Sequence, residues 1–149
     1  MPVVERTALL PFAAQQLFDL VQKVDDYPAF IPGCIAARVE QQEGAVTKAE
    51  LTFRLAGIND RFATENTAIE AAPGVPSLNM RLLRGPFKRL DGEWRFTPLG
   101  EAGCKVSLKV DLDFGPRALQ ALLGPQLERA VSGVIAAFKA RAEAVYGRA

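Results

Sequence analysis

The segment Cys104–Phe114, CKVSLKVDLDF, decides the fold, because its residues alternate between apolar and polar without a break. The apolar residues share one face, and Lys105, Lys109 and Asp111 belong to the other. Successive side chains of a β-strand point to opposite sides, so this period of two predicts a strand with one buried and one solvated face. Strands of this kind are typical of antiparallel sheets, which can face water on one side.

Further strands and a helical segment precede this strand. The period of two extends over 35–114, and a first strand is expected at 3–10. Between them, an apolar stripe at helical spacing predicts an amphipathic helix over about 13–23. These elements give an antiparallel sheet with a helix inserted after its first strand.

A long helix follows the sheet. After Gly115–Pro116 the apolar period returns to 3.6 and continues to about Tyr146. Gly124–Pro125 interrupts the front of this helix, because proline lacks the N–H that a helix interior needs. We therefore expect a kink there, or a short separate helix at 117–123.

This order of elements predicts one α+β domain over 1–149, in which the long helix covers the dry face of a curved sheet. Such a sheet touches a single helix only along a line. The remaining interior is then either filled by large side chains or open as an apolar ligand cavity, and alternation alone does not separate the two. The inward-facing candidates for the cavity lining are Leu51, Phe53, Met80, Leu82, Trp94, Phe96, Val134 and Phe138.

The segment Val24–Cys34, VDDYPAFIPGC, concentrates large apolar groups where no long helix can form. Tyr27, Phe30 and Ile31 lie close to two prolines that are four residues apart. We expect a short helical turn followed by extended chain. The segment is either a flap over a cavity mouth or a hydrophobic plug between helix and sheet.

The composition excludes several kinds of site. The chain has no histidine, and its two cysteines, Cys34 and Cys104, lack CxxC spacing. It therefore cannot build a Ser-His-Asp or Cys-His relay, and no metal site is expected. A net charge of +1 gives no field that would draw the chain to DNA or to an anionic membrane. Without a signal-peptide pattern or an apolar span, we expect a cytoplasmic protein with free, buried thiols.

Several segments together resemble the bacterial RatA-type ribosome-association toxin family. They are VDDYPAFIPGC with the helix before it, AGINDRF, LLRGPFKRLDGEWRFTPL, the alternating strand and the final FKARAEAVYG. This family is similar to the mitochondrial coenzyme Q-binding proteins, and both belong to the START-like, polyketide cyclase/aromatase superfamily. The resemblance covers essentially the whole chain.

The resemblance implies a helix-grip (START/Bet v1-like) fold and non-catalytic binding of a long apolar ligand. The leading candidate is ubiquinone or a similar lipid, in support of respiratory quinone function, with no other cofactor. The resemblance also implies association with the large ribosomal subunit, which blocks subunit joining, and at most a peripheral contact with the inner membrane. The residues that match the lid are Tyr27, Pro28, Phe30 and Pro32, and those that match the sheet motif beside the cavity are Gly85, Pro86, Phe87 and Trp94.

A local group of basic residues offers a candidate ribosome-facing surface, since phosphate neutralisation dominates contacts with RNA. The alternative is an ordinary solvated sheet edge, because Asp91 and Glu93 dilute the charge. The group comprises Arg81, Arg84, Lys88, Arg89 and Arg95.

An enzyme of the polyketide cyclase or aromatase kind is the alternative function. The fold permits it, but fold is weak evidence for chemistry and no acid–base pair stands out in the sequence. Paired, buried carboxylates in the cavity would favour it.

Overall fold

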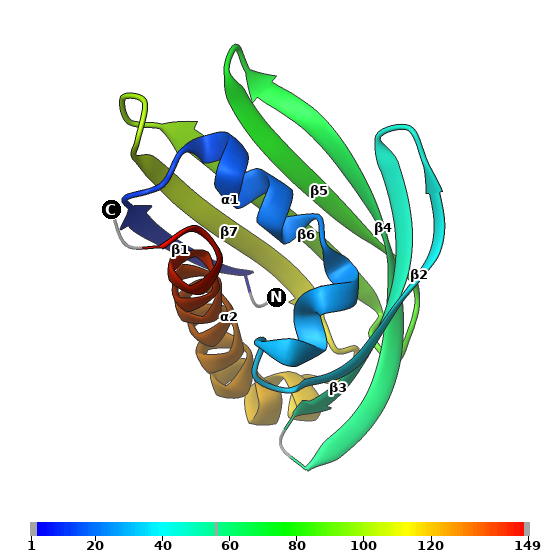
Figure 1. Cartoon of the computed structure of the whole chain (residues 1–149). Helices are drawn as coiled ribbons and strands as arrows, with labels where there is room; N and C mark the ends of the chain where they lie inside the picture. Colours follow the sequence, from blue (N-terminus) through cyan, green and yellow to red (C-terminus); the bar gives the residue numbers. More distant parts are fainter. Residues whose placement is uncertain (1–2, 56, 148–149) are drawn as a thin grey trace.

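The computed structural model describes residues 3–55 and 57–147, so residues 1, 2, 56, 148 and 149 of the predicted 1–149 domain lie outside the described part. One seven-stranded antiparallel sheet curves around a long C-terminal helix (Figure 1). This confirms the expected α+β, helix-grip architecture. In chain order the elements are β1 (Val3–Leu10), α1 (Ala14–Val21), the 3-10 helix η1 (Val24–Ala29), β2 (Cys34–Glu43), β3 (Val46–Leu55), β4 (Ile58–Ala72), β5 (Val75–Arg84), β6 (Arg89–Pro98), β7 (Cys104–Asp113) and α2 (Arg117–Tyr146).

The sheet is a meander with one long connection. Its strand order is β1-β7-β6-β5-β4-β3-β2, so β1 and β2 form the two edges. The helical segments α1 and η1 carry the chain from one edge to the other across the inner face of the sheet (Figure 1). The predicted first strand at 3–10 is confirmed, and the helix expected at about 13–23 is shorter, at 14–21.

Strand β7 has the predicted alternation up to its last residue. Cys104, Val106, Leu108 and Leu112 are buried on the inner face. Asp113 is also buried, although a polar residue was expected to face solvent there. Its carboxylate accepts hydrogen bonds from the Gly115 N–H at 2.8 Å and from the Gln120 side chain at 3.2 Å, so the acid shapes the turn into α2.

Helix α2 is continuous, and the expectation of a separate helix at 117–123 is wrong. It extends from Arg117 to Tyr146 with Pro125 inside it. Proline removes one backbone donor from the helix, and the flanking turns keep their own hydrogen bonds, so one proline does not have to end the element. In Figure 1 the first turns of α2 lie to one side of the axis of the later turns.

The covering elements lie unevenly over the inner face of the sheet. Helix α2 contacts β1 and β7, α1 contacts β5 and β6, and η1 contacts β2. At the α1 end the interior is therefore closed by two helices. Among the described elements, the two α-helices make their main strand contacts on β1, β5, β6 and β7, so the inner faces of β3 and β4 are covered less closely.

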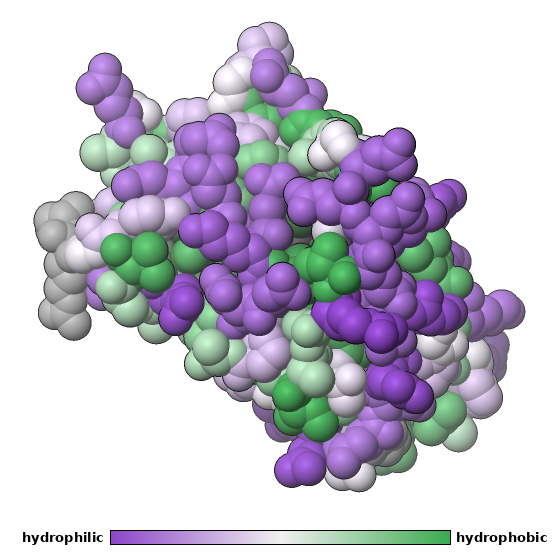
Figure 2. All heavy atoms as spheres, turned by 45° about the vertical axis from the view of Figure 1, so that its right-hand side comes forward, coloured by the Kyte–Doolittle hydropathy of each residue, from purple (hydrophilic) through white to green (hydrophobic). Residues whose placement is uncertain are grey.

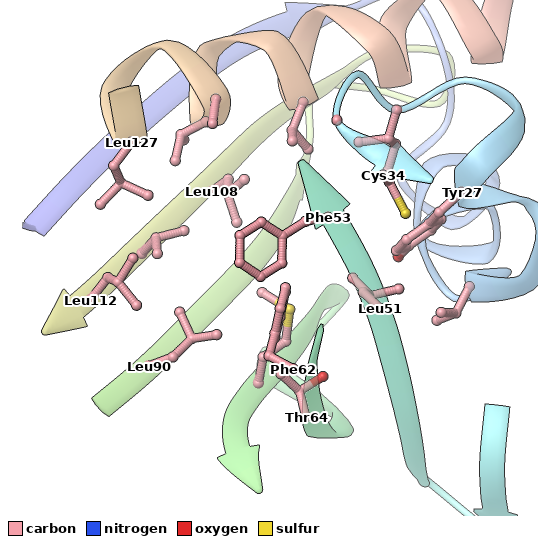
Figure 3. A pocket seen from close by; sticks show the side chains of 18 of the residues that line it. Tyr27, Cys34, Leu51, Phe53, Phe62, Thr64, Leu90, Leu108, Leu112 and Leu127 are labelled. Atoms are coloured by element: carbon pink, nitrogen blue, oxygen red, sulfur yellow. The ribbon is translucent and has the colours of Figure 1, made fainter. Parts of the chain in front are cut away.

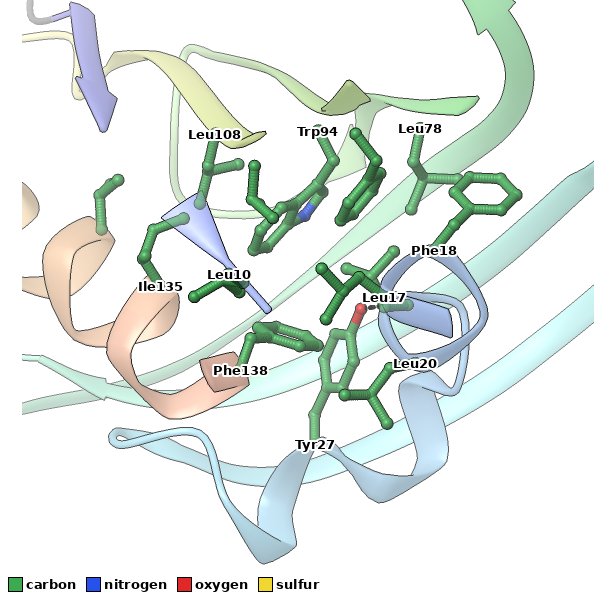
Figure 4. Close-up of a cluster of buried hydrophobic side chains, with 14 of the residues drawn as sticks. Leu10, Leu17, Phe18, Leu20, Tyr27, Leu78, Trp94, Leu108, Ile135 and Phe138 are labelled. Atoms are coloured by element: carbon green, nitrogen blue, oxygen red, sulfur yellow. Dashed lines mark hydrogen bonds between the residues drawn. The ribbon is translucent and has the colours of Figure 1, made fainter. Parts of the chain in front are cut away.

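The α1 end is filled with aromatic and aliphatic side chains (Figure 4). The Phe18 ring meets the edge of Phe96 with centroids 5.9 Å apart, and Phe96 stacks on Trp94 at the same distance. Phe138 from α2 meets Trp94 at 5.0 Å. Offset and edge-on contacts of this kind stabilise aromatic pairs beyond the area that they bury.

Candidate functional site

A pocket of about 260 Å³ lies between β3–β7 and the middle of α2 (Figure 3). We call it the hollow. Its walls are almost entirely apolar. The lining residues are Val24, Tyr27, Ile31, Pro32, Gly33, Cys34, Ala49, Leu51, Phe53, Arg54, Phe62, Thr64, Asn66, Met80, Phe87, Leu90, Trp94, Leu108, Val110, Leu112, Leu127, Ala130, Val131, Val134 and Phe138.

Four phenylalanines cluster beside the β5–β6 turn, and three of them, Phe53, Phe62 and Phe87, line the hollow. The Phe87 ring stacks on Phe53 with centroids 5.8 Å apart, and its edges meet Phe62 at 5.6 Å and Phe114 at 5.9 Å. Glycine is needed at position 85, because a Cβ there would lie 2.7 Å from the Phe62 Cβ. Gly85 thus allows the backbone of the turn to pass close to Phe62, and Phe87 two residues later reaches the hollow.

The hollow reaches solvent-exposed residues at the end of the η1 segment and on β3, and we call this part its mouth. Pro32, Gly33 and Arg54 line the hollow and are also solvent-exposed. The Gly33 carbonyl accepts a 2.7 Å hydrogen bond from the Arg54 N–H, which ties the two sides together. Gly33 has φ +82°, and a Cβ there would lie 3.0 Å from the Arg54 carbonyl oxygen, so a larger residue would strain this corner.

The VDDYPAFIPGC segment serves as plug and as rim in different parts. Tyr27 is buried, and its hydroxyl donates a hydrogen bond to the carbonyl of Val21 at the end of α1. Phe30 packs edge-on against Tyr27 and Phe138, at 6.1 and 5.1 Å, and does not line the hollow. The plug interpretation therefore holds for Phe30, whereas Ile31 and the three residues after it form the rim.

Two polar side chains interrupt the apolar wall on β4. Thr64 and Asn66 are buried, and the Thr64 hydroxyl donates a 2.8 Å hydrogen bond to Asn66 Oδ1. Among the described residues, nothing accepts a hydrogen bond from the Asn66 amide nitrogen. In the described part of the chain, the fully buried side-chain atoms without a partner are Asn79 Oδ1 and Arg141 Nε, so the Asn66 nitrogen is not sealed off and can be reached by a group in the hollow.

Most of the predicted lining residues do lie on the hollow. They come from η1 and its exit, from β3, β5 and β6, from the β5–β6 turn and from α2, as the period-two and helical patterns required. Their role in ligand binding remains a proposal. They are Tyr27, Pro32, Leu51, Phe53, Met80, Phe87, Trp94, Val134 and Phe138.

Three of the predicted lining residues lie away from the hollow for local reasons. Phe96 is buried beneath α1, two residues beyond Trp94 on the same face. Leu82 lies beyond the last β5–β6 pair, Arg81–Asp91, near the end of β5, and is not among the residues that line the hollow. Phe30 is the plug described above.

The two remaining predicted lining residues are exposed prolines. Pro28 lies on the solvent side of η1, and Pro86 lies in the β5–β6 turn. Each shapes the backbone that positions the aromatic residue next to it, and neither lines the hollow.

Sequence reasoning missed the β4 wall. Phe62, Thr64 and Asn66 occupy every second position, and that spacing was a signal that they share a face. The lining candidates chosen from the sequence include no residue of this more polar strand. The aliphatic residues of β6, β7 and α2, among them Leu90, Leu112 and Leu127, also belong to the lining.

The two cysteines are free and occupy different environments. Cys104 is fully buried, and burial raises the pKa of its thiol to about 11. Cys34 lies half-buried on the rim, where burial raises the pKa of its thiol and a contact with the Ala36 carbonyl opposes the shift. Neither thiol is an activated nucleophile. Among the described residues, no three Cys, Asp or Glu side chains are grouped so that they could hold a metal ion.

The predicted basic surface carries mixed charge. Arg81 pairs with Glu65 at 2.8 Å, and Arg84 bridges Glu40 and Glu50. Arg89 pairs with Asp111 at 2.8 Å and Arg95 with Glu93 at 3.3 Å, while Lys88 is exposed. On the face that carries β2 to β4, hydrophilic side chains predominate between separate hydrophobic patches (Figure 2). These carboxylates neutralise much of the charge that the sequence assigned to RNA contact.

The curved sheet, the long helix and the apolar hollow between them define a helix-grip protein of the START-like class. The family model for polyketide cyclase/dehydrase and lipid transport proteins matches residues 10–139. The ribosome association toxin RatA of Vibrio cholerae is 42% identical over 147 residues, 99% of each chain. That of Pseudomonas aeruginosa is 40% identical over 144 residues, 97% of each chain. The chain therefore belongs to this family, within its group of RatA-type ribosome association toxins.

More distant relatives and solved structures agree with this class. A mitochondrial coenzyme Q-binding protein of Xenopus laevis, COQ10 homolog B, is 27% identical over 94% of this chain and 57% of its own length. The solution structure of an 18 kDa protein from Caulobacter crescentus is 35% identical, with a TM-score of 0.78 over 99% of this chain and 100% of that one. The Zhui aromatase/cyclase from Streptomyces has a TM-score of 0.83 over 95% and 93% of the two chains at 18% identity, which shows a shared fold.

Proposed function

We propose that the protein binds an apolar ligand with a polar ring, ubiquinone or a similar lipid, in the hollow and does not transform it. The observation that carries the proposal is the hollow itself, about 260 Å³ with almost entirely apolar walls. Water binds weakly in such a space, because it finds few polar partners there. An apolar ligand gains about 25 cal/mol for each Å² of apolar surface that it removes from water.

The size of the hollow limits how much of the ligand it can enclose. Ligand pockets usually measure about 300–1,000 Å³, so this one encloses a ring and a short chain. A longer isoprenoid tail would leave through the mouth between Ile31 and Arg54. The coenzyme Q-binding relative supports a quinone as the ring.

The side chains around the hollow support binding without chemistry. No Asp or Glu stands among its described lining residues, so proton transfer by a carboxylate has no support there. The Tyr27 hydroxyl donates to the backbone at Val21, and burial raises its pKa above the ordinary value, so it stays protonated. The cyclase alternative rests on similarity of fold with proteins such as the Zhui aromatase/cyclase.

Native mass spectrometry of gently extracted protein, together with quenching of Trp94 fluorescence, tests this proposal. Trp94 is the only tryptophan of the chain and lines the hollow, so a bound quinone would lie close to its indole. We expect a co-purified apolar mass and saturable quenching by added ubiquinone. Finding only the apo mass, with no quenching, would overturn the proposal.

We propose ribosome association as a second activity on the outer surface, because the RatA relatives named above match nearly the full chain. Ribosome association would place the protein in the cytoplasm, and we include this location in the proposal. Among the described helices, none is long and apolar enough to cross a membrane. Since all four arginines of the candidate surface are already paired, we expect a specific, salt-sensitive contact rather than avid binding to any RNA.

Sedimentation with purified large ribosomal subunits at several salt concentrations tests the second activity. We expect co-migration at low salt that weakens as salt rises. Lys88→Ala should weaken it further, and Lys105→Ala is the matched control on β7, outside the candidate surface. Absence of co-migration at low salt would remove this activity from the account.

A further inference from the structure

We propose that Asn66 anchors the polar end of the ligand, by donating a hydrogen bond from its amide nitrogen to an uncharged oxygen such as a ring carbonyl. This inference rests on the proposed binding function and adds the chemical group that the hollow recognises. The hydrogen bond from Asn66 on β4 would be a directional contact in a wall that is otherwise mainly apolar.

The burial of Asn66 is the first observation. The residue is 6% exposed and lines the hollow, and among the described residues its amide nitrogen has no hydrogen-bond acceptor. Buried polar groups in folded proteins nearly always have a partner. A ligand oxygen in the hollow would supply the missing acceptor.

The orientation of the amide is the second observation. Thr64 lies two residues before Asn66 on the same strand face, and its hydroxyl occupies Asn66 Oδ1 at 2.8 Å. Because the oxygen is held along β4 by Thr64, the amide nitrogen is left for another partner. Thr64 therefore acts as a positioning residue for Asn66.

The space beside Asn66 is the third observation. Its cross-strand neighbour on β5 is Met80, and the next residue across the sheet is Gly92 on β6. A Cβ at Gly92 would lie 2.5 Å from the Met80 Cε, so the Met80 methyl lies over β6. Met80 thus leans away from Asn66 and leaves the β4 side of the hollow open.

The chemistry of the wall selects an uncharged acceptor. Arg54, the charged lining residue, is exposed at the mouth. An anionic head group beside Asn66 would lose its hydration without gaining a buried cation, which is unfavourable. A quinone or ketone oxygen needs only one good donor, and the Asn66 amide provides it.

A comparison of two ligands tests the inference. Calorimetric titrations use a decyl-substituted ubiquinone and decylbenzene, which has the same chain but no oxygen. The variants are Asn66→Leu, which removes the amide at similar volume, Thr64→Val, and Asn79→Leu as the matched control on β5. Asn79 does not line the hollow.

We expect Asn66→Leu to weaken quinone binding about tenfold and to leave decylbenzene binding unchanged, which corresponds to the loss of one hydrogen bond. Thr64→Val should give a smaller loss and Asn79→Leu none. The carbonyl stretch of the bound quinone should lie at lower frequency in the wild type than in Asn66→Leu, a signature that a merely structural role would not produce.

Two results would count against the inference, and they differ from each other. If Asn66→Leu weakens both ligands equally, or neither, Asn66 is not an anchor, although the hollow still binds ligands. If the wild-type protein binds neither ligand, the proposed function fails and the inference fails with it. Melting curves of each variant show whether it is folded.

Discussion

The interior beneath α1 and the interior beside the middle of α2 are lined by similar residues, yet only the first is filled. Under α1, Phe18 reaches down from the helix and meets Phe96 on the sheet. Beside the middle of α2, the small side chain of Ala130 faces the hollow. A second helix fills the first region, whereas in the second the sheet curves away from a single helix. We call them the filled half and the hollow half.

Trp94 and Phe138 lie on the border between the halves. Both belong to the core cluster and both line the hollow. Their edge-on contact, with centroids 5.0 Å apart, forms the boundary between the two halves. In one continuous core, the filled half therefore contributes mainly to stability and the hollow half provides the space for binding.

The largest expected effect is the difference in stability lost when one aromatic ring is removed from each half. Phe96→Ala removes a ring that is 2% exposed and should cost about 3–5 kcal/mol of unfolding free energy. Phe53→Ala removes the ring contacts with Phe62 and Phe87 and enlarges an existing pocket, and because this ring is only partly buried it should cost less, about 1–2 kcal/mol. Urea unfolding measures both, and equal costs would contradict the division into halves.

The next comparison adds volume at two alanines of α2. Ala142 is fully buried in the filled half, so Ala142→Phe should overpack it and cost about 3 kcal/mol. Ala130 faces the hollow, so Ala130→Phe should change stability by less than about 1 kcal/mol and abolish quinone binding. A strongly destabilised Ala130→Phe protein would show that the hollow has no room for a ring.

A third comparison divides the segment after η1. Phe30 packs on Tyr27 and Phe138, and the Arg141 guanidinium lies 5.1 Å from the centre of its ring. We expect Phe30→Ala to cost about 2 kcal/mol of stability and to keep ligand affinity, since the ring is only half-buried. Ile31→Ala should lower ligand affinity and change stability little. Denaturant titrations and quenching of Trp94 check the pair, and loss of affinity in Phe30→Ala alone would restore the flap interpretation.

The smallest expected effect is a loss of stability at alkaline pH, caused by the buried Cys104 thiol in the filled half. Burial raises the pKa of the Cys104 thiol to about 11 from an ordinary value of 9.0, so the folded state holds this proton more tightly than the unfolded state. The resulting stability is complete below pH 9 and is lost as the pH rises toward 11. The urea midpoint of the wild type should therefore fall more steeply between pH 9 and 10.5 than that of Cys104→Ala. Parallel curves would show that this thiol ionises normally.

The sequence predicted the faces of the strands better than the depth of the hollow. A period of two places Trp94 and Phe96 on the same face, and the structure agrees. Alternation cannot tell that the coverage by α1 ends between them, because that depends on a contact between distant segments. Coverage is a tertiary property, so the division between filled and hollow halves appears only in the structure.

Polar residues on a buried face were the other limit of sequence reasoning. Thr64 and Asn66 give β4 a polar pattern, and none of its residues was among the lining candidates, although Phe62 and Ala68 mark the same inner face. For the basic group, the sequence left two interpretations open, a ribosome-facing surface and an ordinary solvated sheet edge. Arg84 is held by Glu40 and Glu50, which lie 44 and 34 residues away on β2 and β3.

Methyl NMR spectra recorded during a titration with decyl-substituted ubiquinone test the central claim most directly. The account predicts that the methyl signals of Leu90, Leu112 and Leu127 shift and show contacts to the ligand. The signals of Leu10 and Leu17, which lie in the filled half, should keep their positions. Shifts in the filled half alone, or no shifts at all at saturating ligand, would contradict the account.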